Sequence, residues 1–169
     1  PMSDFAIDLS VNTNLNYEKA IKQICIFCKN NNLDLLFKLH PSLEDNIHEI
    51  IKDNSDDAKI ISSGSVIPLI KKCSLMITFD LSTTILESQL LSKPVISISI
   101  RDSNNLNSKI FDNSCLRIPL EKLEDTATKI LFDDAFCNKL IERGSFFSKS
   151  YLSHQNNSCL SLIHFLEKI

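Results

Sequence analysis

Residues 79–88, with the sequence FDLSTTILES, combine hydroxyl, carboxylate and backbone groups that can hold a phosphate and a ribose. The hydroxyls of Ser82, Thr83 and Thr84 stand where an apolar run ends and a helical pattern begins. The first turn of a helix has free backbone N–H groups, which bind anions such as phosphate. Glu87 lies three residues after Thr84 and four after Thr83, so it projects from the same helix face. A carboxylate there could accept hydrogen bonds from a ribose diol while the helix end holds the phosphate.

The same residues also fit a simpler interpretation, in which Ser82 only caps the helix and Glu87 is an exposed helical residue. Taken alone, this interpretation is favoured, because helix caps are far commoner than phosphate sites. A second motif, KLHP at residues 38–41, changes the balance. It places His40 at the carboxyl end of a neighbouring strand, where an imidazole N–H could donate to a phosphoryl oxygen and stabilise a departing nucleotide. His40 could equally cap the turn before Pro41.

Two further residues are weaker candidates for nucleotide contacts. Lys38 lies two residues before the histidine, on the same face of the expected strand, and could add positive charge or only flank the sheet. Thr13 belongs to an Asn-rich turn after the first expected strand and could touch a phosphate. Such turns usually serve their own backbone hydrogen bonds.

Short β-type runs alternate with helical runs along the chain, and these elements must position the candidate residues. Strands are expected at residues 5–9, 33–39, 59–62, 75–79, 95–100 and 115–118. Helices are expected at residues 17–30, after a cap at Ser42, near residues 67–70, at residues 83–91 and across residues 119–169, with a break at Gly144. This order predicts an α/β fold, a Rossmann-like doubly wound parallel sheet that binds ligands outside the carboxyl ends of its strands. The candidate residues all lie at or beside those ends.

Composition favours a single soluble domain over residues 1–169. The chain is 43% hydrophobic and 23% charged, with a net charge of −3 and 18 scattered basic residues, which argues against nucleic-acid binding. No apolar run approaches the roughly 20 residues that span a bilayer. We expect a cytoplasmic domain, although a longer parent chain could be peripheral to a membrane. Pro1 before Met2 is typical of the remnant of a cleaved tag.

The cysteines and glycines argue against a metal or cofactor site. Six cysteines stand mostly inside apolar runs, as buried thiols do, at positions 25, 28, 73, 115, 137 and 159. Cys25 and Cys28 form a CxxC within a helical pattern, but no second CxxC or HxxxH completes a zinc site. The two glycines, Gly64 and Gly144, leave no GxGxxG or P-loop. We therefore expect neither a metal nor a cofactor.

Together, KLHP, the STT turn with its glutamate, and KPVI at residues 93–96 resemble the C-terminal domain of bacterial GT-B glycosyltransferases of surface and capsular polysaccharide synthesis. The pairing of a His-Pro motif with a Ser/Thr motif is similar to that of the sialyl-, polysialyl- and Kdo-transferases that use CMP-sugars. It is also similar to that of the CDP-glycerol glycerophosphotransferases. The resemblance spans roughly residues 34–100.

The resemblance implies half of a GT-B architecture and a role for each matching residue. His40 would contact the phosphate of the sugar donor as the catalytic residue, and Glu87 would bind the ribose. The phosphate would be bound by Ser82, Thr83 and Thr84. The base would meet main-chain groups of Ser63, Gly64 and Ser65. The ligand implied is a CMP- or UDP-linked sugar nucleotide, and an N-terminal domain would hold a saccharide acceptor.

Three functions follow as alternatives. In the family, the catalytic acid or base usually belongs to the N-terminal domain, and nothing before Phe5 can supply one. We therefore expect a piece of a longer glycosyltransferase, or a separate donor-binding subunit, that cannot complete transfer alone. A nucleotide-sugar 2-epimerase shares the architecture and the Ser/Thr turn with its glutamate, and KLHP favours transfer over epimerisation. A non-catalytic binding or assembly module of the same fold is the third alternative.

Overall fold

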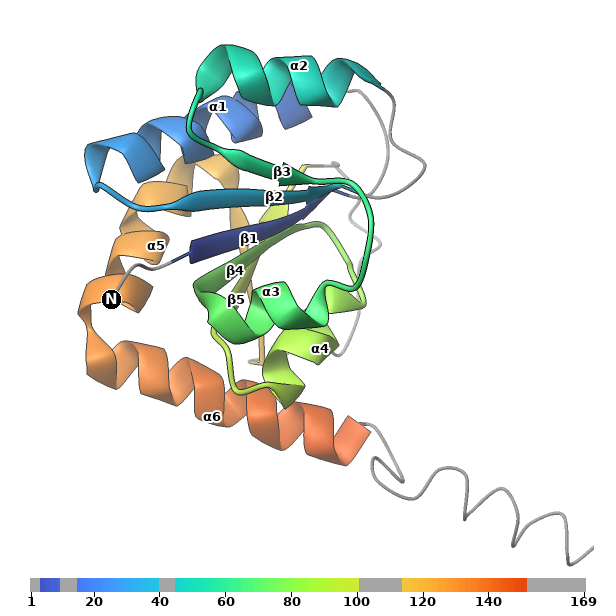
Figure 1. Cartoon of the computed structure of the whole chain (residues 1–169). Coiled ribbons are helices and arrows are strands. Elements are labelled where there is room, and N and C mark those ends of the chain that lie inside the picture. Colours follow the sequence, from blue (N-terminus) through green and yellow to red (C-terminus); the bar gives the residue numbers. More distant parts are fainter. Residues whose placement is uncertain (1–3, 10–14, 40–44, 101–113, 152–169) are drawn as a thin grey trace, which may run out of the picture.

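The computed structural model of the chain describes residues 4–9, 15–39, 45–100 and 114–151. Within these ranges, six parallel strands form one sheet in the order β3-β2-β1-β4-β5-β6 (Figure 1). The strands are β1 (Asp4–Leu9), β2 (Leu35–Leu39), β3 (Lys59–Ile61), β4 (Cys73–Phe79), β5 (Val95–Ser99) and β6 (Leu116–Pro119). The strand order reverses between β1 and β4, which is where doubly wound sheets bind ligands.

Helices cover both faces of this sheet (Figure 1). One face packs against α1 (Leu15–Asn30), α2 (Asp45–Asn54) and α5 (Leu123–Phe132), which follows the 3-10 turn η2 (Leu120–Lys122). The other face packs against α3 (Ile67–Lys72), α4 (Thr84–Leu90) and α6 (Asp134–Tyr151). The predicted fold class, a Rossmann-like doubly wound α/β sheet, is confirmed.

The central strand β4 is apolar on both faces, as its sequence predicts. Leu75, Ile77 and Phe79 belong to the larger core beneath α1 and α5, whereas Met76 belongs to the smaller core beneath α3 and α4. The ring of Tyr17 from α1 meets the ring of Phe79 edge-on, with centroids 5.2 Å apart. This contact fixes the start of α1 against the end of β4, beside the point where the strand order reverses.

The glycine break expected in the C-terminal region is wrong. Helix α6 continues through Gly144, and the chain instead leaves helical geometry at Asp133 (φ −118°, ψ 94°). The carboxylate Oδ1 of Asp133 accepts the backbone N–H of Phe136 at 3.0 Å, which caps the start of α6. Gly144 is buried where a Cβ would lie 2.8 Å from Cγ of Gln89 on α4. The glycine therefore serves close packing of two helices.

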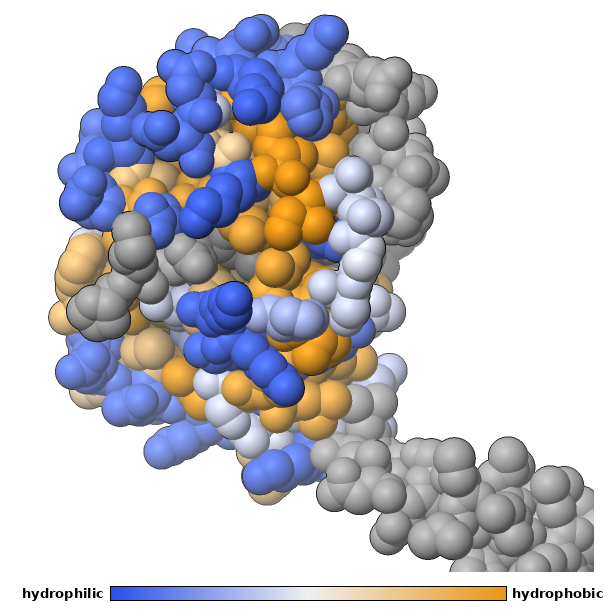
Figure 2. All heavy atoms as spheres, viewed as in Figure 1, coloured by the Kyte–Doolittle hydropathy of each residue, from blue (hydrophilic) through white to orange (hydrophobic). Residues whose placement is uncertain are grey.

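A half-buried apolar strip follows the β3 edge of the sheet. Hydrophilic residues cover α1 and α2, while hydrophobic residues form a band over β2 and β3 (Figure 2). Leu36, Ile60 and Ile61 are half-buried members of this edge. None of the helices in the described ranges is long and apolar enough to cross a membrane.

The interpretation of the cysteines as packing residues is confirmed where the structure describes them. Cys25, Cys28, Cys73 and Cys115 are buried, and Cys137 is half-buried. Position 159 lies outside the described residues.

We expect Cys28 to be unreactive in the folded protein. Burial, with a smaller contribution from nearby Cys25, raises the pKa of Cys28 from 9.0 to about 12. Only the thiolate attacks disulfide reagents, so DTNB at pH 8 should label Cys28 slowly in buffer and rapidly in urea. Because folding raises this pKa, the protonated thiol of Cys28 contributes to the free energy of unfolding below pH 9. This contribution is lost as the pH rises from 9 toward 12. Mass spectrometry would locate the label, with Cys28→Ser as the control, and rapid native labelling of Cys28 would contradict this expectation.

Candidate functional site

The turn between β4 and α4 lies at the carboxyl edge of the sheet and is held by Asp80. Its backbone is left-handed (φ +49°), a conformation that Asp tolerates better than most residues. The N–H of Asp80 donates to the carbonyl of Ile98 at 2.9 Å, and its carboxylate Oδ1 accepts the N–H of Ile100 at 3.0 Å. The hydroxyl of Ser97 donates to the carbonyl of Asp80 at 2.5 Å. These three bonds tie the β4–α4 turn to β5.

The end of β5 also reaches the start of α1. Nδ2 of Asn16 donates to the carbonyl of Ile100 at 3.2 Å. Ile100 therefore bonds to α1 through its carbonyl and to Asp80 through its N–H. This chain of bonds joins the three segments that surround the β1–β4 reversal. It fixes the entry to α4 relative to α1.

The three hydroxyl residues predicted to bind phosphate differ in exposure. Thr83 is exposed, whereas Ser82 and Thr84 are 8% and 4% exposed. Oγ of Ser82 accepts the N–H of Thr84 at 3.2 Å at the entry to α4, whose N-cap position is Thr83. Helix α4 has seven residues, and so short a helix contributes little dipole. An anion here would depend on individual hydroxyl and N–H groups.

Glu87 lies one helical turn beyond Thr83, as the spacing predicts. Its N–H donates to the carbonyl of Thr83 at 3.3 Å, and its side chain is half-buried. The neighbouring turn is further held by Ser88, whose hydroxyl donates to the carbonyl of Thr84 at 2.8 Å. Thr83 and Glu87 thus lie together on one turn at the start of α4. Their binding roles stay predictions.

Lys38 brings a cation to the carboxyl end of β2. Its side chain is 7% exposed, and Nζ donates to the carbonyl of Leu39 at 2.8 Å. A lysine buried to this extent is rare unless it is paired. Since only β1 lies between β2 and β4, the ends of these two strands are roughly 10 Å apart at the usual strand spacing.

The residues after β3 that were predicted to meet the base are not brought into the β4–α4 turn. Ser63, Gly64 and Ser65 are exposed after β3, and Oγ of Ser65 accepts the N–H of Ile67 at the start of α3. Because β2 and β1 separate β3 from β4, that turn lies roughly 14 Å away. His40 and Thr13 lie outside the described residues. Their roles also stay predictions.

A polar row across the sheet was missed by sequence reasoning. Positions on five adjacent strands are in register, one or two residues before the carboxyl end of each strand: Lys38, Asp8, Thr78, Ser97 and Arg117. Thr78 and Ser97 are fully buried. A polar residue inside an apolar strand, such as Ser97 in VISISI, is the signal that could have revealed this row. The side chains of Lys38, Thr78, Ser97 and Arg117 make the sheet polar near the proposed ligand edge.

Arg117 is the member of this polar row that lies on β6. Its Nη2 donates to the hydroxyl of Ser99 at 2.9 Å, which directs the guanidinium group toward the carboxyl end of β5. The guanidinium group could add positive charge to this side of the sheet.

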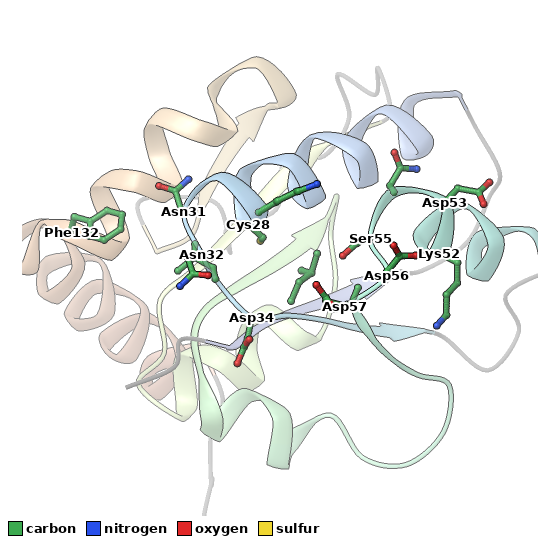
Figure 3. Close-up of a pocket in the computed structure, with 15 residues that line it drawn as sticks. Cys28, Asn31, Asn32, Asp34, Lys52, Asp53, Ser55, Asp56, Asp57 and Phe132 are labelled. Atoms are coloured by element: carbon green, nitrogen blue, oxygen red, sulfur yellow. The ribbon is translucent and has the colours of Figure 1, made fainter.

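A hollow in the described structure lies at the opposite edge of the sheet (Figure 3). It measures about 990 Å³ and lies between the ends of α1 and α2 and the starts of β2 and β3. Four aspartates and two lysines line it: Asp34, Asp53, Asp56, Asp57, Lys29 and Lys52. The excess of carboxylates would repel a phosphate. Within the described ranges, no His, Cys, Asp and Glu side chains gather as metal ligands do.

Solved structures with a similar fold include nucleotide-binding proteins, although no protein-family model and no curated protein matches this sequence. UDP-GlcNAc 2-epimerase from Neisseria meningitidis, bound to UDP-GlcNAc, is 15% identical with a TM-score of 0.65, over 89% of this chain and 43% of that one. A glycosyltransferase from Rickettsia africae is 19% identical with a TM-score of 0.60, over 86% and 42%. Spinosyn rhamnosyltransferase, complexed with thymidine diphosphate, is 15% identical with a TM-score of 0.65, over 99% and 46%.

These likenesses show a fold shared with part of each protein. This chain spans less than half the length of each of them. It has the Rossmann-like architecture of a GT-B-type domain.

We expect Asp80→Ala to destabilise the protein by about 2–3 kcal/mol, because it removes a charged acceptor and leaves a left-handed backbone without Asp or Asn. Asp80→Asn keeps an oxygen and tolerates the same conformation, so its cost should be about 1 kcal/mol. Urea denaturation would measure both, with exposed Asp56→Ala as the control. A free energy of unfolding for Asp80→Ala within about 0.5 kcal/mol of wild type would contradict this role for Asp80.

Proposed function

We propose that this chain binds a sugar nucleotide as the donor-binding domain of a glycosyltransferase that builds a surface polysaccharide. The observation that carries the proposal is the anchored β4–α4 turn, which presents Thr83 and Glu87 beside the reversal of strand order. Ligands of doubly wound sheets bind in that crevice. The KLHP resemblance and the bound ligands of the structural neighbours support the same ligand class.

The phosphates and the ribose of a nucleotide would each have a counterpart at this edge. The hydroxyl of Thr83 and nearby backbone N–H groups would meet the phosphates, and the carboxylate of Glu87 would accept the ribose hydroxyls. The ammonium of Lys38 would add positive charge at the end of β2. The imidazole N–H of His40 would donate to a phosphoryl oxygen. This division of contacts is the one implied by the family resemblance.

Transfer also requires an acceptor held opposite the sugar. In two-domain transferases, closure of a cleft brings the reacting groups together and excludes water. We propose that the opposing wall, with the acceptor and the catalytic base, comes from a second domain. On this proposal the 169 residues bind the sugar donor but need that wall for catalysis.

A nucleotide-sugar 2-epimerase is the second candidate. The specific observation in its favour is the likeness to the Neisseria meningitidis epimerase, which is as similar in structure as the spinosyn rhamnosyltransferase. The nucleobase of the preferred ligand distinguishes the two candidates in part. The transferases that share the His-Pro motif use CMP- or CDP-linked donors.

A thermal-shift panel of CMP, CDP, UMP and UDP tests binding and base preference together. A nucleotide at 100 times its dissociation constant should stabilise the fold by about 2.7 kcal/mol, which is a visible shift in melting temperature. Preference for cytidine nucleotides would support the His-Pro transferases, and preference for uridine nucleotides would support the epimerase or a UDP-sugar transferase. No shift with any of the four at millimolar concentration would indicate the non-catalytic module.

Glu87→Ala should weaken nucleotide binding by about 1.5–3 kcal/mol, the range for hydrogen bonds to a charged group. The fold should survive, because the side chain is half-buried at the edge of the sheet. Calorimetry with the preferred nucleotide measures the loss, and Glu124→Ala on the exposed face of α5 is the matched control. Equal affinity of Glu87→Ala and wild type would make Glu87 an ordinary helix-surface residue.

A further inference from the structure

Helix α6 lies against α4 with no room for a side chain at Gly144. A Cβ on this residue would lie 2.8 Å from Cγ of Gln89, 3.5 Å from its Cβ and 3.4 Å from the carbonyl oxygen of Ser114. Glycine within a helix is unfavourable relative to alanine, because it loses more backbone freedom on folding. Since the chain contains only two glycines, placing one inside α6 indicates that the close approach of the helices matters.

Gln89 cannot easily move out of the way of an added methyl group. It is 2% exposed, and its Nε2 donates to the carbonyl of Ser114 at 3.1 Å. Ser114 is itself buried and lies two residues before β6. Gln89 is therefore held between α6 on one side and the segment that enters β6 on the other. Its backbone belongs to α4, two residues beyond Glu87.

We infer that Gly144 and Gln89 are positioning residues for the proposed nucleotide site, because their contact sets the distance between α4 and α6. This inference rests on the proposed function. Because Glu87 lies two residues before Gln89 on this short helix, we expect displacement at Gln89 to displace Glu87. The other end of α4 is fixed through Asp80 to β5, so a push at Gln89 tilts the helix about that anchor.

A four-protein cycle tests this inference: wild type, Gly144→Ala, Gln89→Ala and the double variant, each as the full 169-residue chain. The clashing Cγ is absent once residue 89 is alanine, so Gly144→Ala should then be tolerated. We expect Gly144→Ala to weaken UDP binding about fivefold in the wild-type background and less than about twofold in the Gln89→Ala background. Calorimetry measures the dissociation constants, and urea denaturation measures the stability of each protein.

If Gly144 and Gln89 only stabilised the fold, their variants would not change the affinity for the nucleotide. General destabilisation does not change the affinity of the folded state while nearly all molecules are folded. Ile130→Val on α5 is the control, since it loosens the core on the face of the sheet opposite α4 and should leave UDP binding unchanged. Unchanged UDP affinity in Gly144→Ala, or an equal loss in both backgrounds, overturns the inference alone. No binding of CMP, CDP, UMP or UDP by wild type removes the proposed function and this inference together.

Discussion

The geometry of the candidate site depends on how Asp80 holds the turn between β4 and α4. Its left-handed backbone redirects the chain at the end of a buried strand, and its carboxylate and carbonyl bond to two residues of the neighbouring β5 segment. Without these bonds, the turn would not be connected to the β5 segment by hydrogen bonds of Asp80. With them, the direction in which α4 leaves the sheet is fixed, and Thr83 and Glu87 take defined positions after the end of β4.

Buried polar groups of this kind must find partners, and the structure supplies them across strands. Thr78 donates to the carbonyl of Ile96 at 3.4 Å, and Ser97 donates to Asp80. Placing polar side chains inside a sheet is costly unless each is hydrogen-bonded. Their alignment in one row near the carboxyl edge is therefore a constraint that packing alone would not produce. It is consistent with an edge adapted to a polar ligand.

The strands could be expected from the sequence because buried parallel strands are short, continuous apolar runs. The stretch LMITF became the centre of β4, and VISIS became β5. The role of Gly144 could not be anticipated, since a glycine that ends a helix and one that admits a neighbouring helix look alike until the neighbour is known. The same holds for Asp80, whose partners Ser97 and Ile100 are distant in the chain.

Two edges of the sheet remain as rival binding sites: the acidic hollow at the amino edge and the carboxyl edge with its anchored turn. A crystal structure of the chain with UDP decides between them most directly. We predict that the diphosphate lies within hydrogen-bonding distance of residues 82–84 and the ribose hydroxyls meet the carboxylate of Glu87. UDP bound in the hollow lined by Asp34 and Asp56, or at any site away from the β4–α4 turn, would contradict the proposed site.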